Sequence, residues 1–209
     1  MQRAVDSQPD APATQQDLAP FVEWGGPVWA AQVQRGLTWV GDLTGLRVLE
    51  IGSRYGGMAT RLALLGAQVT GLEVSHEPLE RARATAAAYG MSDRVRFDVY
   101  SGDPRDLPRG YDVVFSKSTL VLMPDLDMAI AGITASLGVG GRLLLIENAR
   151  GPLPVHLARM LIRRSMRPHG AAYFTRRAVR RIGSHLDIEL ERWTLAPPTV
   201  LVGAVKRSS

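Results

Sequence analysis

Short runs of apolar residues alternate along the chain with longer stretches in which apolar residues recur at helical spacing. The apolar runs predict strands at residues 48–51, 68–73, 95–100, 111–115 and 142–147. The other stretches predict helices at residues 28–40, 58–65, 79–89 and 125–137, with a turn at 138–141. Because strands and helices alternate with short connections, the pattern favours an α/β fold with a doubly wound, mostly parallel sheet and helices on both faces.

The C-terminal part of the chain has a different pattern. It predicts a basic helix at residues 175–186, with Thr175 as its N-cap, and then two strands at 188–195 and 199–205. Only residues 196–198 separate these strands, whereas a parallel crossover needs about a dozen residues. We therefore expect an antiparallel C-terminal pair, which completes a sheet of seven strands.

The ends of the chain and its composition limit the remaining choices. Residues 1–20 carry scattered Pro, Gln and Asp and no apolar stretch, which predicts a disordered arm and no signal peptide. Residues 21–209 then suit a single domain. No apolar run approaches the roughly 18 residues of a membrane-spanning helix, and cysteine is absent. We expect a cytoplasmic protein with neither disulfides nor a bound metal.

Positive charge is concentrated in one segment of the chain. Between Glu147 and Asp187 there are nine arginines and no acidic residue, although the whole chain carries a formal charge of only +5. A basic segment on an otherwise acidic chain indicates an anionic partner, which could be a small substrate, a nucleic acid or a membrane surface. A helix face with solvated arginines would explain the same charge without a partner.

A glycine-rich loop follows the first predicted strand and leads into a helix. It reads Glu50-Ile-Gly52-Ser-Arg54-Tyr-Gly56-Gly57. Glycines in such a turn let the backbone approach a ligand closely. A dinucleotide fingerprint would have glycine where Arg54 stands, and the Gly-Lys-Ser/Thr of a P-loop is absent. The loop therefore fits neither phosphate-binding motif.

These residues resemble the first motif of the class I S-adenosylmethionine-dependent methyltransferases, an acidic residue and two glycines at this spacing. Four further features appear in the family's order: Glu73 at the end of the second strand, Asp103 after the third, the segment 112–125 around the fourth, and the glycine turn before the fifth. The resemblance covers residues 46–148 and extends more loosely to the C-terminal strand pair. It implies the family's Rossmann-like fold and S-adenosylmethionine as cofactor.

The resemblance also implies which residues bind the cofactor. Glu73 would accept hydrogen bonds from the ribose hydroxyls, and Asp103 would accept one from the adenine amino group. Pro104 departs from the pattern, because members commonly use an amide at this position and proline has none. The complete set of expected cofactor-binding residues is Glu50, Gly52, Ser53, Gly56, Glu73, Val74, Asp103, Pro104 and Ser116.

Catalytic residues are harder to identify. An oxygen acceptor often needs a general base, whereas an amine can react once it is deprotonated. The candidates are His156 and His169 in the basic segment, Glu147 at the end of the fifth strand, and Lys117 after the fourth. In the family, the segment after the fifth strand often builds the acceptor pocket, so residues 151–173 are expected to form a basic helical insert on the substrate side.

The residues and the resemblance together indicate an enzyme that methylates an oxygen or nitrogen of a small anionic or polar metabolite, in a secondary-metabolite or sugar pathway. The runner-up is an RNA methyltransferase that uses the arginine-rich residues 150–181. Against it, the Asn/Asp-Pro-Pro-Tyr/Phe motif is missing after the fourth strand, and the insert has few aromatic residues to stack on bases. The chain could also be a cofactor-binding scaffold without methyl transfer or a peripheral membrane-binding protein. The sequence leaves the oligomeric state open.

Overall fold

The computed structural model describes residues 26–151 and 173–207, and it confirms the predicted seven-stranded sheet. The strand order is β3-β2-β1-β4-β5-β7-β6, with every neighbouring pair parallel except β5–β7 and β7–β6, which are antiparallel. The strands are β1 Arg47–Ile51, β2 Gln68–Glu73, β3 Val95–Val99, β4 Tyr111–Lys117, β5 Leu137–Asn148, β6 Asp187–Leu195 and β7 Pro198–Val205. The predicted arm at 1–20 and most of the predicted insert at 151–173 lie outside the described residues.

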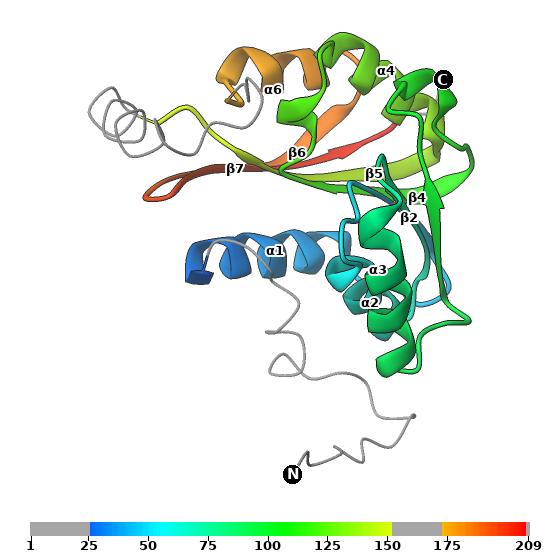
Figure 1. Cartoon of the computed structure of the whole chain (residues 1–209). Helices are drawn as coiled ribbons and strands as arrows, with labels where there is room; N and C mark the ends of the chain where they lie inside the picture. Colours follow the sequence, from blue (N-terminus) through cyan, green and yellow to red (C-terminus); the bar gives the residue numbers. More distant parts are fainter. Residues whose placement is uncertain (1–25, 152–172, 208–209) are drawn as a thin grey trace.

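Helices cover both faces of the sheet (Figure 1). On one face lie α1 Gly26–Val40, α2 Gly57–Leu64 and α3 Glu77–Ala88, and on the other lie α4 Leu126–Ser136 and α6 Arg176–Gly183. Two short 3₁₀ helices, η2 Pro104–Asp106 and η3 Leu120–Leu122, follow β3 and β4 and were not predicted. Within the described residues no helix has both the length and the apolar character needed to cross a membrane.

Each face of the sheet carries its own apolar core, because alternate side chains of a strand point to opposite faces. Val48 and Leu144 contribute to the core under α1, α2 and α3. Leu49 and Leu143, one position away on each strand, contribute to the core under α4 and α6. Strands buried on both faces read as continuous apolar runs, which is why the sequence pattern located them.

The largest boundary error concerns β5, and the helix predicted at 175–186 also ends earlier, at Gly183. The sequence suggested a helix ending at 137, a turn at 138–141 and a strand from 142, but β5 begins at Leu137. Leu137 pairs with Tyr111 and Arg142 pairs with Val113, so β5 is irregular over the stretch between these two pairs. The glycines allow this irregularity, with Gly140 at φ +71°. The strand is therefore continued through the predicted turn.

The fold places a site where the strand order reverses. β1 lies between β2 and β4, so the chain moves outward in opposite directions from the β1–β4 pair. In open parallel sheets, ligands bind outside the carboxyl ends of the strands at this switch point. The loops after β1, β2 and β4 meet there.

Candidate active site

A cavity of about 750 Å³ lies at the carboxyl ends of β1, β2 and β4. One part of its wall comes from the loops after β1 and β2, and another part comes from Lys117 at the end of β4 and from residues 118, 119 and 122–124 after it. Trp29 of α1 and Asn148 at the end of β5 also line it. A volume of this size suits a small-molecule site, since such pockets commonly measure roughly 300–1,000 Å³.

The glycine loop after β1 forms a tight turn into α2. Gly52 has φ +81°, and its N–H donates to the carbonyl of Leu72 on β2 at 2.8 Å. A side chain at Gly52 would place its Cβ only 2.2 Å from Thr119 Oγ1, so the loop after β4 lies directly against the turn. Gly52 lines the cavity, as expected of a backbone that approaches a ligand closely.

Gly56, at the start of α2, contributes to helix packing rather than to the cavity lining. It has φ +75° and precedes the first residue of α2, and a Cβ there would lie 2.9 Å from Ala82 on α3. It is buried and is not among the residues that line the cavity. Gly56 therefore allows α2 and α3 to pack closely rather than facing the ligand space.

Glu73 lies at the end of β2, and its carboxylate contacts the glycine loop after β1. One oxygen accepts from the backbone N–H of Arg54 at 3.0 Å, and the other accepts from that of Val74 at 2.8 Å. Both Glu73 and Val74 line the cavity. A carboxylate has about four acceptor positions, so two remain for a ligand. The structure thus holds Glu73 in a fixed orientation with acceptor capacity to spare.

Three more of the expected cofactor-binding residues lie near this turn. Glu50 and Ser53 are both buried, with exposed fractions of 4%, and both line the cavity. Ser116, on β4, is fully buried and is not among the lining residues. The structure therefore places Glu50 and Ser53 at the cavity, whereas Ser116 is buried and does not line it.

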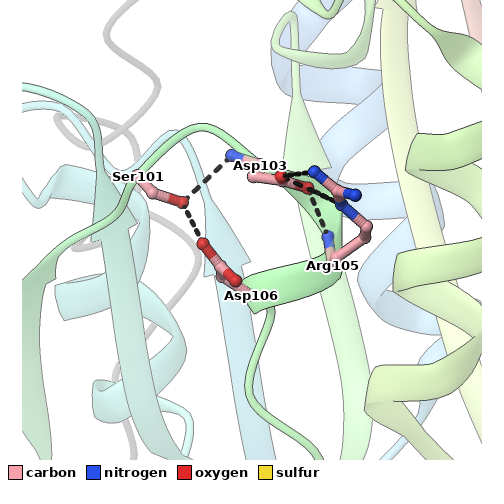
Figure 2. A network of polar contacts seen from close by, with 4 residues as sticks. All are labelled: Ser101, Asp103, Arg105 and Asp106. Atoms are coloured by element: carbon pink, nitrogen blue, oxygen red, sulfur yellow. Dashed lines mark hydrogen bonds and ion pairs between the residues drawn. The ribbon is translucent and has the colours of Figure 1, made fainter.

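Asp103 and Pro104 are not among the lining residues. The Asp103 carboxylate accepts from the backbone N–H of Arg105 and from its guanidinium, an arrangement that Figure 2 shows beside Ser101 and Asp106. These bonds lower the pKa of Asp103 to about 2 and engage both of its oxygens. Both Asp103 oxygens thus bind Arg105, and binding of the adenine amino group by Asp103 stays a prediction.

Pro104 begins η2 and is buried against α4. A Cβ at Gly132 of α4 would lie 2.3 Å from the carbonyl oxygen of Pro104. Tyr100, just before this turn, does line the cavity, and burial raises the pKa of its hydroxyl to about 12. The turn after β3 therefore contributes Tyr100 and Gly102 to the cavity, which the sequence did not single out.

The cavity wall after β4 combines apolar and polar groups. Leu122, Met123 and Pro124 supply apolar surface, and Leu122 is 60% exposed. Lys117 lines the cavity with its ammonium nitrogen 5.4 Å from the centre of the Trp29 ring, within the range of a cation–π contact. Lys117 is thus the one catalytic candidate that the described part of the chain places at the cavity wall.

Glu147 lies behind that wall. It is fully buried, and its Oε1 accepts from the backbone N–H groups of Thr119 at 3.0 Å and Leu120 at 2.8 Å. Burial raises its pKa to about 8, although the backbone donors act in the opposite direction. Glu147 is not among the lining residues, so it does not face the ligand space.

The other two base candidates, His156 and His169, lie outside the described residues. Within the described ranges no group of three or more His, Asp or Glu could hold a metal ion. Lining residues that sequence reasoning missed include Arg54, Met58, Ser118, Thr119 and Asn148. Except for Met58, which lies in the first turn of α2, their only signal was a position at the carboxyl end of a strand or just after it.

Known methyltransferases match the part of the chain that carries most of this cavity. A family model described as a methyltransferase domain matches residues 49–143. The chain is 31% identical over 120 residues to a ubiquinone biosynthesis O-methyltransferase of Aeromonas salmonicida, a match that covers 56% of this chain and 50% of that protein. It is 35% identical over 117 residues to the 27-O-demethylrifamycin SV methyltransferase of Amycolatopsis mediterranei, with coverages of 54% and 42%. The chain thus spans about half the length of the curated relatives it matches.

The fold agrees over a longer range. A solved S-adenosylmethionine-dependent methyltransferase from Mesorhizobium loti superposes with a TM-score of 0.64 at 20% identity, covering 87% of this chain and 99% of that one. That enzyme is named as dependent on S-adenosylmethionine. Residues 49–143 of this chain therefore match a methyltransferase domain, and the described fold is that of solved S-adenosylmethionine-dependent methyltransferases.

Proposed function

We propose that this protein transfers a methyl group from S-adenosylmethionine to a hydroxyl oxygen of a small molecule. The observation that carries the proposal is the meeting of the Gly52 turn and the Glu73 carboxylate at one cavity, where Arg54 N–H lies 3.0 Å from Glu73. Oxygen is the proposed acceptor atom because the relative from Aeromonas salmonicida is named an O-methyltransferase.

The residues present fit the cofactor. Gly52 offers close backbone approach, and Glu73 keeps acceptor positions for two vicinal ribose hydroxyls, each a charge-assisted hydrogen bond. Glu50 and Ser53 lie beside the turn at the cavity wall. Bound there, the cofactor supplies an electrophilic methyl group on a sulfonium. The protein's own task is to align the acceptor with it and to exclude water.

The wall after β4 and Trp29 would hold the acceptor. Ser118 and Asn148 present polar groups, and Leu122 and Met123 present apolar surface, which suits an acceptor with a polar reacting end and an apolar body. The Lys117 ammonium would stabilise negative charge on an acceptor oxygen that loses its proton. This charge supports the expectation of an anionic or polar acceptor.

The arginines of α6 give less support to a nucleic-acid substrate. Arg176 pairs with Glu191 at 3.8 Å and Arg181 pairs with Asp127 at 3.3 Å, so part of the helix's charge is used in surface ion pairs. Binding of RNA would weaken steeply with salt because counterions are released. Binding of a small acceptor should change far less.

A transfer assay tests the proposal. The protein is incubated with methyl-labelled S-adenosylmethionine and a panel of phenols, enols and sugars, beside amines and RNA. Label is expected on a hydroxyl compound and is expected to fall at least about tenfold in Lys117→Met, which removes a charge worth roughly 1.4 kcal/mol or more to the transition state. Label on RNA or on amines alone would overturn the proposal.

A further inference from the structure

The cavity wall after β4 is shaped by an unusual backbone. Ser118 has φ +58°, which a non-glycine residue rarely adopts, and its N–H donates to the carbonyl of Ile146 at 2.9 Å. Thr119 and Leu120 follow, and Leu120 begins η3. A three-residue 3₁₀ helix is too short to hold its own position. Something outside the segment must therefore fix residues 118–124, which we call the acceptor-side wall.

The outside support comes from β5. Thr119 is the N-cap residue of η3, yet its side chain makes no capping hydrogen bond. The Glu147 carboxyl takes that place, since a single oxygen accepts from the N–H groups of both Thr119 and Leu120. Asn148, next on β5, donates from its side-chain amide to Ser118 Oγ at 3.2 Å. Three consecutive residues of the wall are thus bound to the end of one strand.

The same support reaches the glycine loop. Thr119 lies against Gly52 so closely that a methyl group on Gly52 would overlap it. A shift of Thr119 would therefore change the shape of the cavity at two places, next to the Gly52 turn and next to Lys117. Glu147 controls this position without lining the cavity itself.

We propose that Glu147 is a positioning residue whose buried carboxyl fixes the acceptor-side wall against the glycine loop. This role in the reaction rests on the proposed methyl transfer, whereas the structural support does not. It replaces the interpretation of Glu147 as a general base, because a base must reach the proton that it removes. Glu147 Oε1 is occupied by two backbone donors, and Oε2 is buried.

Two substitutions separate these roles. Glu147→Gln keeps a carbonyl oxygen for both N–H groups, and it matches the neutral carboxyl expected at pH 7 when burial raises the pKa to about 8. Glu147→Leu keeps a similar volume but removes the acceptor, so that two buried donors lose their partner. Leu143→Ala, a fully buried change further back on the same strand, serves as the control for general destabilisation.

Amide hydrogen exchange of the full chain gives a readout that needs no ligand. In Glu147→Leu the amides of Thr119 and Leu120 are expected to exchange about 10- to 100-fold faster relative to the β1 amides, the scale of leaving a buried donor unpaired. Glu147→Gln is expected to stay close to wild type. The control is expected to change all the strands together. Faster exchange at both amides in Glu147→Gln, or no selective change in Glu147→Leu, would overturn the proposal.

Binding of S-adenosylhomocysteine and turnover complete the test. We expect Glu147→Leu to weaken binding about tenfold, as for a misplaced site wall, and Glu147→Gln to retain wild-type kcat and KM for any acceptor found. A Glu147→Gln variant that folds and binds but loses kcat would restore the general-base interpretation. If the wild type failed to bind S-adenosylhomocysteine, the proposed function would fall, and the exchange experiment would still decide the structural role of Glu147.

Discussion

Replacing Gly52 with alanine tests how tightly the glycine loop packs against the acceptor-side wall. The added Cβ would lie 2.2 Å from Thr119 Oγ1 and 2.9 Å from Thr119 Cγ2, at a backbone φ of +81°. Two penalties follow. The left-handed backbone costs an alanine about 1–2 kcal/mol, and overpacking adds about 1–3 kcal/mol. We expect Gly52→Ala to lower the free energy of unfolding by about 2–5 kcal/mol.

Gly140 provides a matched control. Its φ is +71°, close to that of Gly52, but a Cβ there would meet no atom within 4 Å. Gly140→Ala should therefore show the backbone penalty alone, about 1–2 kcal/mol. The difference between the two variants isolates the contact with Thr119.

Urea denaturation followed by circular dichroism measures both variants, and a third variant sharpens the comparison. Thr119→Ala removes Oγ1 and Cγ2, so the double variant Gly52→Ala/Thr119→Ala should recover about 1–2 kcal/mol relative to the sum of the single changes. The reasoning is refuted if Gly52→Ala destabilises no more than Gly140→Ala, or if the two changes at residues 52 and 119 are additive.

Three other predictions concern charged and buried polar groups. Between pH 4.5 and about 8 the folded Glu147 keeps a proton that the unfolded chain has released, so the unfolding free energy of the wild type should fall as pH rises through that window, by at most roughly 5 kcal/mol. In Glu147→Gln this pH-dependent loss should be absent when thermal unfolding is measured across the same range. A pH dependence of stability in Glu147→Gln equal to that of the wild type would contradict the raised pKa. Glu73→Ala should weaken S-adenosylhomocysteine binding about 10- to 100-fold in calorimetry, because two charge-assisted bonds are lost; equal affinity would exclude Glu73 from the site. Tyr100→Phe removes a buried hydroxyl that has no hydrogen-bond partner among the described residues, so the unfolding free energy should stay within about 1 kcal/mol of wild type or rise; a loss of several kcal/mol would show that the hydroxyl is paired.

The fold could be predicted because the local pattern of apolar and polar residues determines which segments form strands and helices. The segment Leu143–Ile146 of β5 is buried on both faces, so it appears in the sequence as an unbroken apolar run. Thr175 caps α6 as predicted, by accepting from Ala178 N–H. The β5 boundary failed because glycine favours a turn locally. Pairs on either side of that stretch, at Leu137 and Arg142, together with the backbone bonds that Gly140 and Gly141 make with Lys206, nevertheless keep it in the sheet, and such pairing is a tertiary effect.

Cavity-lining residues could be predicted only where a sequence motif specified both the residue type and its position at the end of a strand. The Glu50–Gly52 turn and Glu73 lie at the cavity because strand ends determine their positions. Asp103, which the resemblance implies as an adenine-binding residue, is not among the lining residues and binds Arg105, a contact that depends on side-chain geometry; its role toward the cofactor stays a prediction. The support of Thr119 by Glu147 spans 28 residues of sequence and joins a side chain to backbone donors, so no spacing rule could reveal it.

Calorimetric titration of the purified protein with S-adenosylmethionine and S-adenosylhomocysteine, beside NAD, tests the central claim most directly. Micromolar binding of both sulfur compounds and none of NAD is the expected result, since the loop after β1 lacks the glycine that a pyrophosphate needs. Binding of NAD alone, or of none of the three, would contradict the assignment of this cavity to a methyl donor.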